Sequence, residues 1–350
     1  MQGDGGWTGP GSIEKCIRAQ VEPESFSGVM QILRGGRVLF EGAYGLANRP
    51  ESIPNRINTR FQTASGCKAF TAAALLQLID RGKLKPETPL AACVDIEFPD
   101  YAPGITIHHL LTHTSGITSY FEEDLNPDYE ALWRDTPMYR IREPGDFLPL
   151  FQNKPMKFRP GERFDYNDGG YILLGLVLEA ISGLGFAEYI KKHIFDPARM
   201  NDSGYFPTDR LPDRTAYAYI KNDDGTWRTN FFAVPIVGAP DGGAYTTAPD
   251  LARFWEALRS GRLLSAPVAA AMLEPRVITD LDSPYNHYGY GVWVDKPGNS
   301  VRKYFVVGSD PGVALHSAFY PERGMILTMI GNTGGALWPL YKDIERAINL

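Results

Sequence analysis

The stretch FQTASGCKAFTAAALLQLIDRGKL, residues 61–84, carries the strongest pattern in this 350-residue chain. Its Ala, Leu and Ile residues recur three and four positions apart until Gly82, which predicts a helix with a largely apolar surface. Ser65 stands at the entrance of that helix, and Lys68 follows one turn later. Because side chains three residues apart share one helix face, the Lys68 amine can take the proton of the Ser65 hydroxyl.

The Ser-x-x-Lys spacing alone is weak evidence, because the chain contains it three times. The pair that begins at Ser12 lies beside a Gly-rich start, and the pair that begins at Ser300 opens a predicted strand, on which residues three apart point to opposite faces. Only Ser65 opens a long apolar helix, where free backbone N–H groups can bind an oxyanion and an apolar environment is expected to lower the pKa of Lys68. A helix cap beside a solvated lysine is the alternative that this pair leaves open.

Strand patterns lie towards both ends of the chain. Residues 28–48 form a predicted hairpin that turns at Gly35 and Gly36, and four β-rich runs follow at 288–294, 301–307, 313–320 and 325–331. We therefore predict an α+β fold in which an antiparallel sheet is flanked by N- and C-terminal helices. Residues 1–85 and 247–350 form this sheet domain, residues 86–246 form a mainly helical inserted domain, and a cleft between them holds the chemistry.

Composition excludes several classes of function. Lys plus Arg number 35 against 41 Asp plus Glu, a net charge of −6, so no basic surface for nucleic acid or an anionic membrane is expected. Cys16, Cys67 and Cys93 show no CxxC spacing, which argues against a disulfide framework or a zinc site. Neither a signal peptide nor a stretch of about 20 apolar residues is visible, which predicts a soluble, cytoplasmic protein unless a leader was removed.

Five segments of the chain resemble, in the same order, the serine β-lactamase and penicillin-binding protein superfamily, specifically its class C-like branch of esterases and D-peptidases. They cover most of residues 61–332, and they are residues 61–84, ITIHHLLTHTSGI at 105–117, PGERFDYNDGGYILLGLVLE at 160–179, GGAYTTAPDLARF at 242–254 and VVGSDPGVALHSAFYPE at 306–322. The resemblance implies a β-lactamase/transpeptidase-like fold and a covalent acyl-enzyme without a cofactor.

The resemblance also implies a role for individual residues. Ser65 corresponds to the acylated nucleophile, Lys68 to its helix partner, and Tyr166 to the phenol that shuttles the proton. Gly308 lets the backbone approach the substrate closely, and the N–H of Ser309 is the second oxyanion donor beside that of Ser65. A tyrosine beside a lysine ammonium is expected to have its phenolate favoured.

Two positions depart from the family pattern. Asp168 replaces the usual Asn two residues after the Tyr; an ionised Asp168 can hold Lys68 by charge but cannot donate to a substrate amide, and Asn167 is the neighbouring amide that could compensate. Val306 replaces the Lys or His that precedes x-Gly. Because this removes the usual partner of a substrate carboxylate, the sequence favours neutral substrates.

The favoured function is a serine acyl hydrolase that acts on a small ester or amide, with esterase-like activity preferred over a β-lactamase or a D-peptidase. An acyltransferase that uses the same acyl-enzyme and a non-catalytic penicillin-binding-like protein are the alternatives. His109 and His113 are four residues apart, but no HExxH pattern accompanies them, so no metal is predicted.

Overall fold

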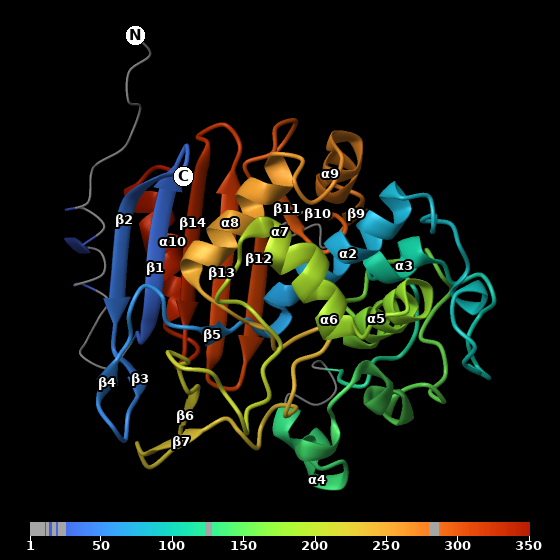
Figure 1. The fold of residues 1–350 in the computed structure, drawn as a ribbon, viewed down its shortest axis with the longest axis horizontal. Coiled ribbons are helices and arrows are strands. Elements are labelled where there is room, and N and C mark those ends of the chain that lie inside the picture. Colours follow the sequence, from blue (N-terminus) through green and yellow to red (C-terminus); the bar gives the residue numbers. More distant parts are fainter. Residues whose placement is uncertain (1–10, 12–13, 16–18, 20–25, 123–127, 280–286) are drawn as a thin grey trace.

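The structure is a computed structural model that describes residues 11, 14–15, 19, 26–122, 128–279 and 287–350. Ser12 and Cys16 lie outside these residues, as does most of the predicted N-terminal helix. Figure 1 shows a broad sheet with helix α8 in front of it and α10 behind it, while α2, α3, α5 and α6 gather beside the sheet. The chain is therefore layered around a sheet, with a helical region at one side.

The main sheet contains eight strands among the described residues, and every pair of neighbours is antiparallel. This confirms the predicted sheet, in which the first hairpin pairs with the late strands through β1 and β14. In spatial order the strands are β2 (Arg37–Tyr44), β1 (Gly28–Arg34), β14 (Met325–Gly331), β13 (Val313–Tyr320), β12 (Lys303–Asp310), β11 (Trp293–Asp295), β10 (His287–Tyr288) and β9 (Val277–Ile278).

Glycines make two of the turns between these strands. The β1–β2 hairpin turns at Gly35 and Gly36 with φ values of 57° and 79°, as predicted. The run at 288–294, predicted as one strand, instead splits into β10 and β11 because Gly291 turns with a φ of 74°. A Cβ atom on Gly291 would lie 2.5 Å from the Cβ of Ala72, so glycine also lets this turn pack against helix α2.

Most of the helices lie, in sequence, between the first strands of the main sheet, β1 and β2, and its later strands, β9 to β14. In chain order they are α2 (Lys68–Asp80), α3 (Ile107–Leu111), α4 (Leu132–Asp135), α5 (Asp168–Ser182), α6 (Phe186–Ile190), α7 (Asp196–Ala198), α8 (Ala248–Arg259), α9 (Ala266–Leu273) and α10 (Leu337–Ala347). Shorter helical turns are η1 (Ala64–Cys67), η2 (Leu90–Ala92), η3 (Tyr129–Ala131), η4 (Met138–Arg140), η5 (Pro144–Leu150) and the π-turn η6 (Lys191–Phe195). Three small strand pairs complete the fold: β3 (Leu46–Asn48) with β4 (Ile53–Pro54), β5 (Phe61–Gln62) with β8 (Tyr245–Thr246), and β6 (Tyr219–Lys221) with β7 (Trp227–Thr229).

Helix α2 forms the centre of the molecule. All its residues from Lys68 to Leu78 are buried, because α5, α6 and α9 pack against it. A second apolar cluster lies on the opposite face of the sheet under α10, where Met30, Phe305 and Leu340 pack together. Within the described residues no single helix is long and apolar enough to cross a membrane, and α5 and Phe186–Ala198 pass that test only as a pair bent by 77°.

A buried polar cluster fastens α10 to the sheet. Lys303 Nζ lies 2.8 Å from Glu345 Oε1 and donates to the Tyr341 hydroxyl at 3.0 Å. The imidazole of His316 stacks on the Tyr341 ring at a centroid distance of 3.5 Å, and neither of its nitrogens has a hydrogen-bond partner among the described residues. Burial, with a smaller effect of the Lys303 charge, holds the pKa of His316 well below its usual value.

The pKa of His316 predicts acid sensitivity. Below a pH of about 6.5 the unfolded chain binds a proton at His316 that the folded protein does not, so stability is lost as the pH falls at about 1.4 kcal/mol per unit. Between pH 7 and pH 5 the wild type should lose ~2 kcal/mol more than His316→Phe does. Urea unfolding of both proteins at both pH values measures this, and equal losses would contradict the prediction.

Candidate active site

The turn η1 holds Ser65 at the entrance of α2. Ala64, directly before it, has a φ of 44°, a left-handed conformation that non-glycine residues adopt only when their surroundings enforce it. The carbonyl of Ala64 accepts hydrogen bonds from Thr63 Oγ1 at 3.1 Å and from the N–H of Gly243 at 3.2 Å. These bonds keep the half-buried Ser65 side chain at the wall of a cavity.

Lys68 lies directly beneath Ser65. Its Nζ donates to Ser65 Oγ at 2.9 Å and to the Asp241 carbonyl at 2.7 Å. A third bond, of 2.6 Å, joins it to Asp168 Oδ1. The side chain of Lys68 is only 2 % exposed, and its three ammonium protons match these three acceptors.

The charge state of Lys68 differs from the sequence expectation. Burial alone would lower its pKa, as predicted, but the negative charges of Asp168 and Asp241 and the hydrogen bond to Asp168 outweigh burial. The pKa is therefore raised well above its usual value. The apolar residues around α2 were visible in the sequence, whereas the carboxylates that approach Lys68 come from segments about 100 residues or more away in the chain.

Tyr166 lies on the other side of Lys68. Its ring centroid is 4.9 Å from Lys68 Nζ and 6.1 Å from the stacked ring of Trp293. Burial raises the pKa of Tyr166 to about 12, although the Lys68 charge and hydrogen bonding to Lys68 and Ser65 act against it. At neutral pH the resting group is a phenol, and the expected preference for phenolate is not met because burial dominates.

At the start of α5, Asp168 faces the cavity and Asn167 does not, whereas the sequence suggested that the Asn167 amide could also serve the substrate. Asn167 Oδ1 caps the helix by accepting from the N–H of Gly170 at 2.8 Å, and its Nδ2 donates to the Ile117 carbonyl at 2.7 Å. Its backbone N–H donates to His113 Nδ1 at 3.0 Å. Asn167 is thus buried and is not among the residues that line the cavity, whereas Asp168 lines it and faces Lys68.

Gly308 lets strand β12 touch the nucleophile turn. A Cβ atom at this position would lie 2.0 Å from the Thr63 carbonyl oxygen and 3.0 Å from the Gly66 nitrogen, so no side chain fits. Ser309 follows it, is exposed and lines the cavity. Val306 does not line the cavity, because its side chain, 3 % exposed, packs into the main apolar core.

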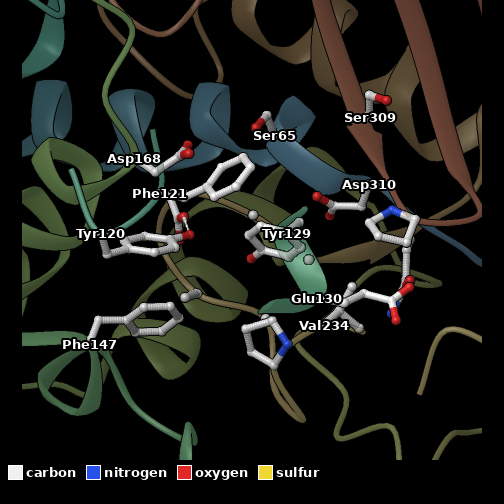
Figure 2. Close-up of a pocket in the computed structure, with 18 of the residues that line it drawn as sticks. Ser65, Tyr120, Phe121, Tyr129, Glu130, Phe147, Asp168, Val234, Ser309 and Asp310 are labelled. Atoms are coloured by element: carbon white, nitrogen blue, oxygen red, sulfur yellow. Dashed lines mark hydrogen bonds between the residues drawn. The ribbon is translucent and has the colours of Figure 1, made fainter. Parts of the chain in front are cut away.

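The cavity in front of Ser65 has a volume of about 560 Å³. Figure 2 shows Ser65 at its upper wall, with Asp168 and Asp310 on either side and the rings of Tyr120, Phe121, Tyr129 and Phe147 below. Among the described residues that line it, none is a lysine or an arginine. Seven are carboxylates: Glu122, Asp128, Glu130, Asp165, Asp168, Asp241 and Asp310.

The sequence motifs did not single out Asp241 or Asp310 as site residues. Asp241 stands immediately before the GGAYTT segment, and Asp310 follows Ser309, so adjacency to recognised motifs was the available signal. Their place in one cavity depends on the loop before β8 folding over η1, where Gly242 approaches Ala64.

The histidines that could have suggested a metal are engaged elsewhere. His108 Nδ1 lies 2.9 Å from the Tyr290 hydroxyl, and His109 completes a capping box with Thr106 at the start of α3. His113 accepts from Asn167, as described above. In the described part of the chain no group of three or more His, Cys, Asp or Glu side chains is placed to hold a metal ion.

Comparisons with known proteins agree with this geometry. The Beta-lactamase family model matches residues 13–348. The chain is 30 % identical to the putative penicillin-binding protein PbpX of Bacillus subtilis over 88 % of this chain and 71 % of that protein, and 31 % identical to the esterase EstB of Burkholderia gladioli over 65 % and 64 %. The crystal structure of a penicillin-binding protein from Bacillus halodurans superposes with a TM-score of 0.90 at 45 % identity, covering 95 % of this chain and 99 % of that one. The chain therefore belongs to the β-lactamase family.

Proposed function

We propose that this protein hydrolyses a small ester or amide through an acyl-enzyme on Ser65. The observation that carries the proposal is the buried chain of contacts from Ser65 Oγ through Lys68 Nζ to Asp168 Oδ1, at 2.9 and 2.6 Å. A hydroxyl in such a chain can lose its proton to a base within hydrogen-bond reach. Membership of the β-lactamase family and similarity to an esterase support the same chemistry.

Proton transfer in acylation starts from the ion pair. Lys68 passes one proton to Asp168, and the resulting amine accepts the proton of Ser65 while Oγ forms a bond to the substrate carbonyl carbon. The carbonyl electron pair moves onto oxygen, where the backbone N–H groups of Ser65 and Ser309 stabilise it. This transfer is uphill, because the carboxylates around Lys68 raise its pKa, and it proceeds together with the attack of Oγ on the substrate carbonyl.

Tyr166 completes the cycle as a proton donor. When the tetrahedral intermediate collapses, the bond to the leaving group breaks and the Tyr166 phenol gives that group its proton. Tyr166 regains a proton from Lys68, and Lys68 regains one from Asp168, so the resting charges return. In deacylation, water takes the place of the serine hydroxyl as the attacking group and loses its proton to the same relay. The Ser65 oxygen is now the leaving group; it regains its proton, and the acid is released.

The test is covalent labelling followed by turnover. A fluorophosphonate is expected to add once to the protein and to stop hydrolysis of a neutral short-chain p-nitrophenyl ester, measured by intact mass and by nitrophenol release. An adduct without hydrolysis in water, but with ester exchange in added alcohol, would identify an acyltransferase. The absence of both adduct and hydrolysis would favour a non-catalytic binding protein.

A further inference from the structure

The carboxylates around the cavity are unequally neutralised. Five of the seven form ion pairs: Glu122 and Asp165 with Lys157 at 2.6 and 2.5 Å, Asp128 with Arg134 at 2.9 Å, Glu130 with Arg228 at 2.5 Å, and Asp168 with Lys68 at 2.6 Å. Among the described side chains, no ion-pair partner contacts Asp241 or Asp310. These two carboxyl groups therefore line the cavity without an ion pair to a described side chain.

Asp241 and Asp310 approach Ser65 from two different elements. Asp241 is 4 % exposed; its side chain accepts a hydrogen bond from the Tyr120 hydroxyl, while its carbonyl holds Lys68. Asp310 ends strand β12, directly after Ser309, and Figure 2 shows its carboxyl group pointing into the space in front of Ser65. A substrate whose carbonyl oxygen meets the N–H of Ser309 would therefore place its next atoms beside Asp310.

The position of Asp310 is fixed by the turn that follows it. The carbonyl of Pro311 accepts from Asn230 Nδ2 at 3.1 Å, and the same Nδ2 donates to Gln62 Oε1 at 2.7 Å. Gly312 turns with a φ of 74° against the backbone of Tyr219, where a Cβ atom would lie 2.8 Å from the Tyr219 nitrogen. Since these contacts hold the turn on both sides, the backbone of Asp310 is fixed in position at the cavity wall.

The electrostatics of this wall oppose anions. Burial, then the negative charges of Asp168 and Asp241, raise the pKa of Asp310 to about 8, and burial raises that of Asp241 to about 6 despite the nearby Lys68. At pH 7 Asp310 is therefore mostly protonated in the free protein, while a substrate carboxylate would still meet the negative charges of Asp241 and Asp168. A cation would instead favour the ionised form of Asp310 and gain a charge-assisted hydrogen bond from it.

We infer that the preferred substrate carries an ammonium group on the carbon next to the scissile carbonyl, and that Asp310, supported by Asp241, binds this group. The inference rests on the proposed function, because the cavity and the nucleophile define the site and the carboxyl groups decide which acyl groups enter it. It also gives a new basis for the discrimination against carboxylates: the sequence attributed this to Val306, which is buried, whereas the cavity's own acidic side chains supply it.

Three methyl esters of the same shape test the inference. Alanine methyl ester, used as both enantiomers, carries the ammonium; methyl isobutyrate replaces it with a methyl group; monomethyl methylmalonate replaces it with a carboxylate. At pH 7 we expect kcat/KM for one alanine enantiomer to exceed that for isobutyrate by ~10-fold or more, after division by the hydroxide-catalysed rates, and the malonate ester to be the slowest.

Variants identify the group responsible. Asp310→Asn removes the carboxyl group that a bound cation would ionise, at nearly constant shape, and is expected to reduce the alanine-to-isobutyrate ratio ~10-fold or more, whereas Asp196→Asn, in an exposed pair with Lys191, should leave both rates unchanged. If Asp310→Asn fails to fold in a thermal melt, Asp241→Asn is measured in the same way. A wild-type ratio near one, or a ratio that neither variant changes, overturns the inference.

The outcome separates this inference from the proposed function. If fluorophosphonate labels Ser65 but the esters turn over too slowly, alaninamide and isobutyramide are compared as protectants against labelling, and protection by alaninamide that is no stronger than that by isobutyramide overturns the cation preference alone. If Ser65 is not labelled, the proposed function has failed, and the inference fails with it.

Discussion

Replacement of Ser65 by alanine is expected to lower ester hydrolysis by roughly 10⁴-fold or more and to abolish covalent labelling, because it removes the hydroxyl that forms the acyl-enzyme. Ser309 also has a hydroxyl at the cavity wall, but the three contacts of Lys68 go to Ser65, Asp168 and Asp241. Steady-state rates with a neutral p-nitrophenyl ester measure the loss.

Ser300→Ala is the matched control. Ser300 lies before β12, and Lys303, its partner in the Ser-x-x-Lys spacing, points instead to the buried pair with Glu345. This variant should therefore keep its rate. A similar loss in both variants, or retained hydrolysis in Ser65→Ala, would contradict the assignment of the nucleophile.

Lys68→Ala is expected to lower kcat/KM by ~100-fold or more, because it removes the group that takes the Ser65 proton. It also leaves the partly buried Asp168 without its cation, which destabilises the fold, so thermal melting must show that the variant is folded at the assay temperature. Lys191→Ala, which breaks an exposed ion pair, controls for the loss of a lysine. A folded Lys68→Ala protein with a near-normal rate would remove Lys68 from the mechanism.

The Asp168→Asn variant distinguishes the relay from a simple lysine base. It keeps the Lys68 amine but removes the largest influence that raises its pKa, so that pKa falls and the proton must leave to solvent instead of to Asp168. Activity of this variant should be low at pH 7 and rise with pH through the lowered pKa of Lys68, while the wild type shows no such rise. Identical pH profiles would exclude Asp168 as the proton acceptor.

The sequence was sufficient for those features that depend on local spacing. The apolar period after Ser65 predicted α2, and the alternating runs predicted the antiparallel sheet that the structure and the family model confirm. The Ser65–Lys68 contact follows from one turn of helix, so the structure reproduces it directly. The roles of Ser65, Lys68, Tyr166, Gly308 and Ser309 in catalysis remain predictions that the experiments above test.

Features that depend on tertiary packing could not be predicted. The pKa of Lys68 is set by Asp168 and Asp241, which only the folded chain brings beside it, so its direction was wrong when judged from apolar neighbours. Val306 is buried because of the way β12 packs against η1, a close approach that Gly308 permits. The spacing of the residues in the sequence does not show which side of the strand faces the core. The acidic lining of the cavity has the same origin, because its seven carboxylates come from several loops, the helix α5, the turn η3 and the strand β12.

The location of the acyl group on the chain tests the central claim most directly. The wild-type protein is mixed with a fluorophosphonate or a slowly hydrolysed ester, quenched in acid and digested, and the modified peptide is sequenced by mass spectrometry. We predict a single modification on Ser65, within residues 61–84. Modification of any other residue, with Ser65 unmodified, would contradict it.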